Sequence, residues 1–254
     1  MPPTGRAALL GASALAAAGV AHTLPGLVHF RWLRTSLWPG LAGIGAADHV
    51  ALTFDDGPDP ASTPAFLDEL DRLGVRATFF LLGSQVRRAG GLTAELACRG
   101  HELAVHGYRH VNHLGRPWWW AVDDVRRARD LIEGAGGVEV RWFRPPYGAL
   151  ASSSLVAARQ AGLRTVLWTT WGRDWRPGID AGEVVAVVRS NMYPSATVLL
   201  HDSDVTSAPG SWKRSLAALP TLVEEWRAAG LRVGTLAEHG VAGDGDGDTR
   251  CLGS

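Results

Sequence analysis

The chain has 254 residues, of which 46% are hydrophobic, and its 25 basic residues balance 25 acidic ones. This length and apolar content suffice for one substantial core, and α/β barrels of this size often form a single domain. A formal net charge of zero does not indicate a nucleic-acid partner or an anionic membrane surface. Cys98 and Cys251 stand far apart, so they form neither a disulfide framework nor a CxxC metal site.

The N-terminal segment, residues 1–45, has a composition of its own. Arg6 precedes an apolar run over residues 7–21, and the alanines at 16–18 fit an A-x-A cleavage site. This pattern is typical of a signal peptide, and a run continued to Phe30 would be long enough for a membrane anchor. An alanine-rich helix packed on the rest of the chain is the alternative. We expect an exported protein, in the cell envelope or outside the cell, with a signal or anchor segment and lead-in ending near residue 45.

From residue 49 onward, short β-branched and aromatic runs alternate with amphipathic helical patterns. Seven strands are predicted, at residues 49–54, 77–82, 102–106, 141–144, 164–170, 197–201 and 232–236. Helices are predicted between them, at residues 64–73, 85–99, 117–133, 152–161, 182–191 and 211–229. This alternation implies parallel strands with right-handed crossovers and favours an α/β fold, a distorted (β/α)7 barrel over residues 46–240, although periodicity alone does not exclude an open sheet. Residues 241–254, rich in glycine and aspartate, are expected to form a disordered tail.

Ionisable residues stand at or just past the C-terminal ends of five predicted strands. They are Asp55, Asp56, His106, Arg144, Asp174 and His201. In β/α barrels the active site lies on this face, so these side chains are expected to converge on one mouth. The adjacent carboxylates of Asp55 and Asp56 repel each other and resist burial, which indicates a function other than packing.

The segment HGYRH places His106 and His110 four residues apart, so one helical turn would bring both imidazoles to the same side. With one aspartate they make a His₂-carboxylate set, and three protein ligands with an open position suit a catalytic zinc. The spacing alone is weak evidence, because nine histidines produce chance spacings. His113 is a competing ligand one turn further on, and His101 is expected to be a capping or solvated residue. The remaining histidines have no evident partner: His22, His29, His49 and His239.

Five stretches carry a resemblance to a known family. They are TFDDGP (53–58), HGYRH (106–110), RPPYG (144–148), RDW (173–175) and LLHD (199–202). The sequence resembles the polysaccharide deacetylases of the NodB-homology type, carbohydrate esterase family 4, from residue 49 to about 236. The resemblance implies a metal-dependent hydrolase that removes acetyl groups from an N-acetylated glycan, such as peptidoglycan or chitin. It also implies one divalent metal, zinc or alternatively cobalt, and a glycan partner with N-acetylglucosamine-type units; we expect a monomer.

The resemblance assigns the base and the metal ligands. Asp55 would be the catalytic base, held ionised and oriented by Arg144. Asp56, His106 and His110 would bind the metal. A bound zinc lowers the pKa of water to roughly 7 and polarises the acetyl carbonyl, and Asp55 would accept the water's proton.

The resemblance also assigns the acid and the pocket. His201 would be the general acid, and Asp174 would orient it and raise its pKa. The backbone N–H of Tyr147 would help to bind the oxyanion. The substrate pocket would be formed by Pro145, Pro146, Trp175 and Leu199.

Two positions depart from the family pattern. Gly107 stands where serine or threonine usually follows the first histidine, and Trp171 stands where the fourth motif usually opens with a polar residue. Trp168, Trp171 and Trp175 flank the expected site, where sugar rings stack on aromatic faces. The three tryptophans at 118–120 cannot all face inward on a helix, so at least one should be exposed.

Two alternative functions remain open. The first keeps the fold and the metal but acts on O-acetylated xylan or on another amide. The second is a metal-binding or glycan-binding pseudoenzyme. The presence of Asp55 and His201 argues against the second, because a binding protein needs neither a base nor an acid.

Overall fold

The structure is a computed structural model that describes residue 13 and residues 19–241. The strands of this part of the chain are β1 (His49–Asp55), β2 (Thr78–Leu81), β3 (Glu102–Val105), β4 (Trp142–Phe143), β5 (Arg164–Thr165), β6 (Thr170–Trp171), β7 (Thr197–His201) and β8 (Arg232–Gly234). They form one sheet in the order β5-β4-β3-β2-β1-β7-β6, with β8 paired to the start of β1, and every pair is parallel.

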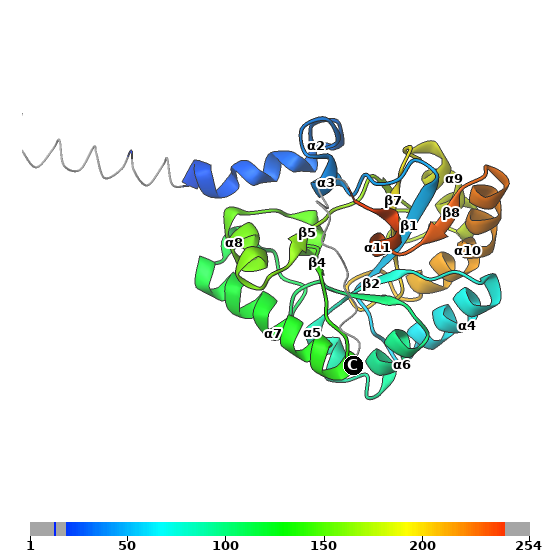
Figure 1. The fold of residues 1–254 in the computed structure, drawn as a ribbon, viewed down its shortest axis with the longest axis horizontal. Helices are drawn as coiled ribbons and strands as arrows, with labels where there is room; N and C mark the ends of the chain where they lie inside the picture. Colours follow the sequence, from blue (N-terminus) through cyan, green and yellow to red (C-terminus); the bar gives the residue numbers. More distant parts are fainter. Residues whose placement is uncertain (1–12, 14–18, 242–254) are drawn as a thin grey trace, which may run out of the picture.

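Helices cover the outside of this curled sheet (Figure 1). The longer helices are α4 (Thr63–Leu73), α6 (Leu92–Cys98), α7 (Trp118–Gly136), α8 (Ser152–Gln160), α9 (Ala181–Ser190) and α10 (Ser211–Ala228). The short ones between them are α5 (Gly83–Val86), η2 (His113–Gly115), η3 (Pro146–Gly148) and α11 (Leu236–His239). At the N-terminal end lie η1 (Leu24–His29), α2 (Arg31–Leu37) and α3 (Pro39–Ala42). Because β5 and β6 do not pair, the barrel is incomplete, and the predicted distorted (β/α)7 barrel is confirmed.

Two predicted elements are divided. The helix predicted at 85–99 is α5 and α6, separated by Gly90, whose φ of 58° is left-handed. The strand predicted at 164–170 is β5 and β6, which pair with β4 and β7 respectively. Between β5 and β6, residues of the N-terminal segment form hydrogen bonds with backbone groups that would otherwise pair with a neighbouring strand. Leu167 N–H donates to Leu41 O, and the Arg34 guanidinium donates to Trp168 O.

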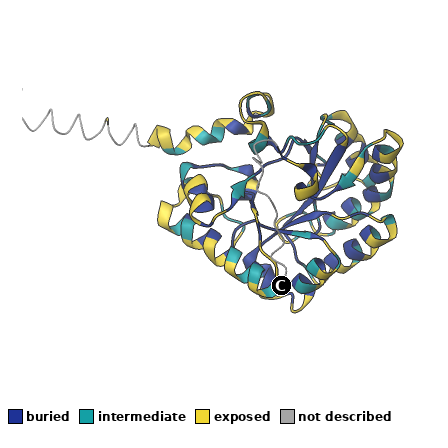
Figure 2. Cartoon of the chain, in the orientation of Figure 1, coloured by how far each residue is buried: buried dark blue, intermediate teal, exposed yellow. Residues whose placement is uncertain are grey.

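The alternation of β1 decides where its side chains go. Leu52 and Phe54 are buried against the surrounding helices in the main apolar cluster. Ala51 faces the barrel interior in a second cluster, and Thr53 and Asp55 follow it on the same face because successive side chains point to opposite sides. Figure 2 shows the resulting pattern, with buried strands inside helices whose outer faces are exposed. A long apolar strand therefore delivers a carboxylate to the interior at its C-terminal end.

Several histidines lie elsewhere than expected. His101 is buried rather than solvated, and its Nδ1 accepts a hydrogen bond from Ala77 N–H. His49 and His239 are partners, with their Nδ1 atoms 3.0 Å apart in the interior. His22 contacts Ser152 Oγ and Leu114 O. These contacts cross long stretches of chain, which the sequence alone does not reveal.

The tryptophan run and the N-terminal segment show two further features. Trp118 and Trp119 are 56% and 62% exposed, so the prediction that at least one member of the run faces solvent is confirmed. Among the described residues (13 and 19–241), no helix is both long enough and apolar enough to cross a bilayer. Most of the run predicted as a signal peptide, and all of the predicted tail except Val241, lie outside the described residues.

Candidate active site

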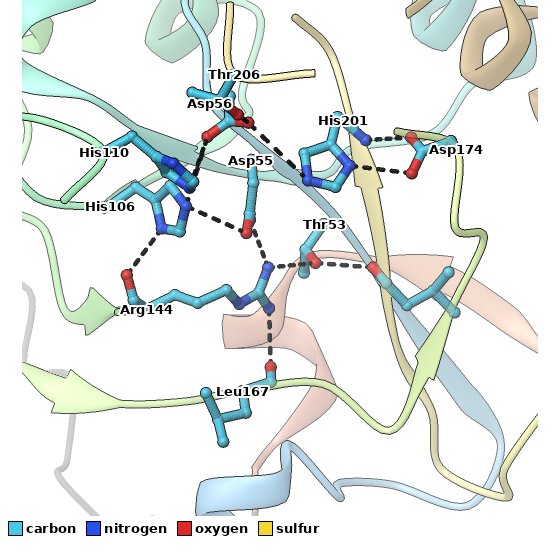
Figure 3. A network of polar contacts seen from close by, with 11 residues as sticks. Thr53, Asp55, Asp56, His106, His110, Arg144, Leu167, Asp174, His201 and Thr206 are labelled. Atoms are coloured by element: carbon cyan, nitrogen blue, oxygen red, sulfur yellow. Dashed lines mark hydrogen bonds and ion pairs between the residues drawn. The ribbon is translucent and has the colours of Figure 1, made fainter. Parts of the chain in front are cut away.

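A cavity of about 550 Å³ opens at the C-terminal ends of the strands. Its walls combine ionisable and aromatic side chains with two loop hydroxyls; they are His29, Asp55, His110, Tyr147, Trp168, Trp171, Arg173, Trp175, Arg176, Leu199, His201, Thr206 and Ser207, together with Gly148. Figure 3 shows the polar side chains beneath this cavity converging from β1, β7 and the loops after β3, β4 and β6. The expected convergence on one mouth is therefore present.

Asp55 is held by a buried arginine. Arg144 Nη1 donates to Asp55 Oδ1 at 2.6 Å and also contacts Thr53 Oγ1 at 2.9 Å, while Nη2 donates to Leu167 O at 2.9 Å. The guanidinium carbon lies 3.9 Å from the centre of the Phe80 ring. Burial lowers the pKa of Arg144 and the Asp55 charge opposes that effect, so the guanidinium stays protonated.

Asp56 faces two imidazoles. Its Oδ1 lies 3.5 Å from His106 Nε2 and 3.6 Å from His110 Nε2. Burial opposes ionisation of Asp56, but His201, His106 and His110 together with the Thr206 hydroxyl lower its pKa. The Thr206 hydroxyl donates a hydrogen bond to Asp56 Oδ2, whereas the buried Asp56 Oδ1 makes no hydrogen bond with the described residues. One carboxylate oxygen is thus left for another partner.

The two histidines present lone pairs to the same point. His106 Nδ1–H donates to Arg144 O at 2.8 Å, so Nε2 is the ring nitrogen that is turned toward Asp56. Burial and then the neighbouring His106 lower the pKa of His110 to about 4, so its ring is neutral near pH 7. One ligand atom from each of Asp56, His106 and His110 lies within 4.8 Å of the others. Two nitrogens and an unpartnered buried carboxylate oxygen at this spacing fit a divalent cation such as zinc.

The route that brings His110 to this point differs from the prediction. Residues 106–110 form a loop rather than a helical turn. Gly107 has a φ of 91°, a conformation that side chains disfavour, and a Cβ there would lie 2.7 Å from Asp124 Oδ2. Asp124 of α7 accepts hydrogen bonds from Tyr108 N–H and Arg109 N–H. We infer that this carboxylate supports the loop where relatives of the family carry a hydroxyl.

His201 is oriented by Asp174. His201 Nδ1 lies 3.0 Å from Asp174 Oδ1, and its backbone N–H donates to Oδ2, which also accepts from Ser215 Oγ. Burial disfavours a charged imidazole, but the charge and hydrogen bond of Asp174, with help from Asp56 and Asp55, raise the His201 pKa to about 10. With Nδ1–H directed at Asp174, the mobile proton sits on Nε2, which faces the cavity 4.0 Å from Asp56 Oδ2.

Tyr147 lies on η3 with a φ of 60°, the left-handed region that is unusual for a residue with a side chain. Its ring is exposed and packs on His110 with the centroids 4.2 Å apart. Within the described residues its backbone N–H has no backbone or side-chain acceptor. A free N–H on a strained turn beside the ligand histidine suits the predicted oxyanion contact.

Aromatic rings and an aliphatic floor complete the cavity. Trp175 packs edge-on against His201 with the centroids 5.5 Å apart, and Trp168 meets Trp171 at 6.1 Å. Leu199 is buried in a small cluster with Trp168 and Leu167. Two other predicted pocket residues, Pro145 and Pro146, are buried and lie outside the cavity lining, where they shape the turn that carries Tyr147.

The N-terminal segment forms one wall of the cavity. His29 of η1 lines it directly, and Val28 is buried beside Trp168 and Leu199. Buried Arg34 joins Val28 O at 2.9 Å to Trp168 O, and Arg31 donates to Thr169 O and Asn191 O. This segment is therefore part of the site's architecture and not only a lead-in to the barrel.

Comparisons with known proteins decide the family. A family model described as polysaccharide deacetylase matches residues 43–166. The chain is 34% identical over 211 residues to a chitooligosaccharide deacetylase of Sinorhizobium fredii, with 78% of this chain and 94% of that protein covered. The chain belongs to the polysaccharide deacetylase family.

Two further relatives of this family define the range of the similarity. A peptidoglycan-N-acetylglucosamine deacetylase of Bacillus cereus is 31% identical over 188 residues, and the match spans 74% of this chain but only 66% of that protein. The structure of a CE4 family pseudoenzyme from Bacillus anthracis aligns with a TM-score of 0.69 at 26% identity, over 76% of this chain and 65% of that one. A polysaccharide deacetylase fold therefore does not by itself establish activity, and the argument for activity rests on the site residues.

Some contributors to the site were not predicted. Thr53 belongs to the TFDDGP motif and could have been suspected from it. Thr206 and Ser215 follow the last motif and bond Asp56 and Asp174, but nothing in their spacing indicates this. Asp202, inside LLHD, is buried, and burial followed by the Asp56 charge raises its pKa to about 7 against the hydrogen bond from Thr63. His113, the competing ligand, lies instead beside Ser154 Oγ at 3.2 Å.

Proposed function

We propose that the chain is a metal-dependent hydrolase that removes acetyl groups from an N-acetylated glycan. The observation that carries this proposal is that a fixed base, a three-ligand cation site and a protonatable histidine share one cavity. Asp55, the Asp56–His106–His110 set and His201 occupy these three places. The relatives named as chitooligosaccharide and peptidoglycan deacetylases support the same class of reaction.

The three protein ligands would hold one divalent cation, zinc or alternatively cobalt. When bound, such a cation lowers the pKa of water and polarises a carbonyl oxygen. The chain's own groups supply the rest. The neutral ring of His110 and the lowered pKa of Asp56 suit ligation, which requires an unprotonated imidazole nitrogen and an ionised carboxylate.

The proton transfers follow from the positions of two side chains. Asp55, fixed by Arg144, accepts a proton as water adds to the acetyl carbonyl carbon. The Tyr147 N–H donates to the oxyanion that forms. His201 then delivers its Nε2 proton to the nitrogen, the C–N bond breaks, and acetate and the free amine leave. Asp174 keeps the imidazole protonated until that step.

The aromatic walls suit a sugar ring. Trp168, Trp171 and Trp175 present faces and edges to the cavity, and pyranose rings stack on such surfaces. Leu199 at the floor suits the methyl of an acetyl group. We further propose that the chain works outside the cytoplasm, on the basis of the apolar run after Arg6.

Acetate release from N-acetylated chito-oligosaccharides tests the proposal. Activity should vanish with a chelator and return with added zinc or cobalt, and Asp55→Asn should stay inactive at full metal occupancy. Acetate release from O-acetylated xylan but not from the chito-oligosaccharides would favour the esterase alternative. Stoichiometric metal binding without turnover of either substrate would favour the pseudoenzyme.

A further inference from the structure

A second cavity, of about 520 Å³, is lined by Ser84, Arg87, Arg88, Tyr108 and Arg109. A smaller cavity of about 190 Å³ shares Tyr108 and Arg109 with it and extends to Arg127. We name Arg87, Arg88, Arg109 and Arg127 the arginine cluster. The first two follow α5, the third lies on the loop between the ligand histidines, and the last belongs to α7.

The arginine cluster is organised around one buried phenol. Arg87 Nη1 donates to Tyr108 Oη at 3.0 Å, and the Arg127 guanidinium carbon stands 3.9 Å from the ring centre. The Arg109 guanidinium lies 6.0 Å from the same ring. The hydrogen bond from Arg87 and the nearby arginine charges lower the pKa of Tyr108. Tyr108 thus gathers exposed guanidinium groups on a rigid support.

The 520 Å³ cavity has no carboxylate in its lining, whereas Asp123 and Asp124 line the smaller cavity beside Arg109 and Arg127. Between residues 19 and 241, none of the four members of the arginine cluster forms an ion pair, whereas Arg126 and Arg129, on the same helix as Arg127, pair with Asp123 and Asp130. The carboxylate closest along the loop, Asp124, is buried and accepts the N–H groups of Tyr108 and Arg109. At the 520 Å³ cavity, Arg87, Arg88 and Arg109 are held together with no acidic side chain in the lining, and this arrangement favours an incoming anion.

The rim of the active-site cavity is also positively charged. Arg173 and Arg176 line it, and neither forms an ion pair with a described residue. Asp55 is the one carboxylate of that lining, and Arg144 already neutralises it. In a chain with zero formal net charge, cationic groups therefore gather on both sides of His110.

We propose that the arginine cluster binds an anionic oxygen group, phosphate or carboxylate, carried by the glycan polymer that the active site deacetylates. This proposal rests on the proposed function and narrows its substrate to an acidic glycan. The planar guanidinium fork matches both anions with paired hydrogen bonds. Arg109 lies within the loop that carries His106 and His110, so the proposal requires a polymer that extends from the active site across this loop.

The test compares two chito-oligosaccharides of equal length, one carrying neutral 6-O-carbamoylmethyl groups and the other 6-O-carboxymethyl groups, which are close in size and differ in charge. The variant is Arg87→Gln/Arg88→Gln. The matched control is Arg72→Gln/Arg232→Gln, which removes the same charge from two exposed arginines paired with Glu69 and Asp48. We expect the variant to raise KM for the carboxymethylated oligomer by about tenfold at low salt, with kcat and the neutral oligomer's KM within about twofold of wild type.

An equal rise in KM for both oligomers, or an equal loss in the control, would overturn the proposal. Binding of the carboxymethylated oligomer to the metal-loaded Asp55→Asn protein, by calorimetry, gives a readout that does not need turnover. If no glycan is deacetylated, the proposed function fails, whereas weaker binding after adding Arg87→Gln/Arg88→Gln still supports the cluster. If the cluster binds inorganic phosphate but does not prefer the charged oligomer to the neutral one, the site binds a free anion. That result would overturn the proposal that the anion is carried by the glycan polymer.

Discussion

Arg144 Nη1 lies 2.6 Å from Asp55 Oδ1, and the two side chains are 0% and 3% exposed. The same guanidinium is fixed by Thr53 and Leu167 O, so it cannot swing away when the carboxylate gains a proton. Arg144 therefore fixes the position of Asp55, the proposed base, through Oδ1, while its Oδ2 lies 3.6 Å from His106 Nε2.

Asp55→Asn should abolish turnover and spare the metal. The amide is nearly isosteric and its oxygen can still accept from Arg144, but it cannot accept the water's proton. We expect kcat to fall by at least about a hundredfold, because loss of a general base typically costs 10²–10⁴-fold. Metal content, measured by elemental analysis, should equal that of wild type. A variant retaining more than about a hundredth of the rate would show that Asp55 is not the base.

His106→Ala should remove the metal from the site. It deletes one of three ligands and leaves His110 as the one imidazole facing Asp56 Oδ1 among the described residues. Elemental analysis should report a stoichiometry near one for wild type and close to zero for the variant. His22→Ala is the control, since this histidine contacts Ser152 Oγ and Leu114 O and none of the three ligands. Equal metal content in wild type and His106→Ala would refute the ligand assignment.

Asp174→Asn should move the alkaline limb of the pH profile. Activity requires Asp55 ionised and His201 protonated, so kcat/KM should be bell-shaped. Asp174 helps to raise the His201 pKa to about 10 against the effect of burial, and a cation on Asp56 would leave Asp174 as the main support. Removing that charge lowers the His201 pKa, so the alkaline limb should shift toward acid by more than one pH unit. An unmoved limb at full metal occupancy would contradict the acid–carboxylate pair.

Gly107→Ser, which restores the usual residue of the family, should weaken metal binding here. The new Cβ would meet Asp124 Oδ2 at 2.7 Å on a backbone with φ of 91°. We expect at least about a tenfold loss of zinc affinity in chelator competition, as for other changes to groups that support ligands. Gly90→Ser is the control, because its φ is also positive but nothing lies within 4 Å. Unchanged affinity in Gly107→Ser would show that Asp124 does not constrain the loop.

The buried His49–His239 pair should make the fold acid-sensitive. Burial, followed by the neighbouring His49, lowers the His239 pKa to about 4. Between about pH 6.5, the pKa of an unperturbed histidine, and about pH 4, this histidine is protonated in the unfolded chain but not in the folded one. The free energy of unfolding therefore falls as pH falls, by up to about 3 kcal/mol for this histidine. Denaturant unfolding from pH 7 to 4 should give a shallower slope for His239→Gln than for wild type or for His29→Gln, an exposed histidine. Equal slopes would contradict this assignment.

The sequence predicted the convergence of ionisable side chains because they stand at or just past the ends of strands. Parallel strands bring their C-terminal ends together, so Asp55, Arg144 and His201 could be placed at one mouth without knowing the loops. It did not predict how His110 arrives, because the loop depends on Asp124 of a later helix. It also missed the division of β5 from β6, because the groups that separate them come from Leu41 and Arg34, more than a hundred residues earlier.

If the proposed export signal is removed, the wall formed by η1 makes the position of the cut important for the active site. A cut after the alanines at 16–18 would leave a mature N-terminus at Gly19 and keep the contacts of Val28, His29 and Arg34. A cut placed only some twenty residues deeper would uncover the apolar side of Trp168 while leaving the cation ligands untouched. Such a shortened form would still bind metal, but it would bind the proposed sugar substrate poorly. Metal content alone would therefore not show that the active site is intact.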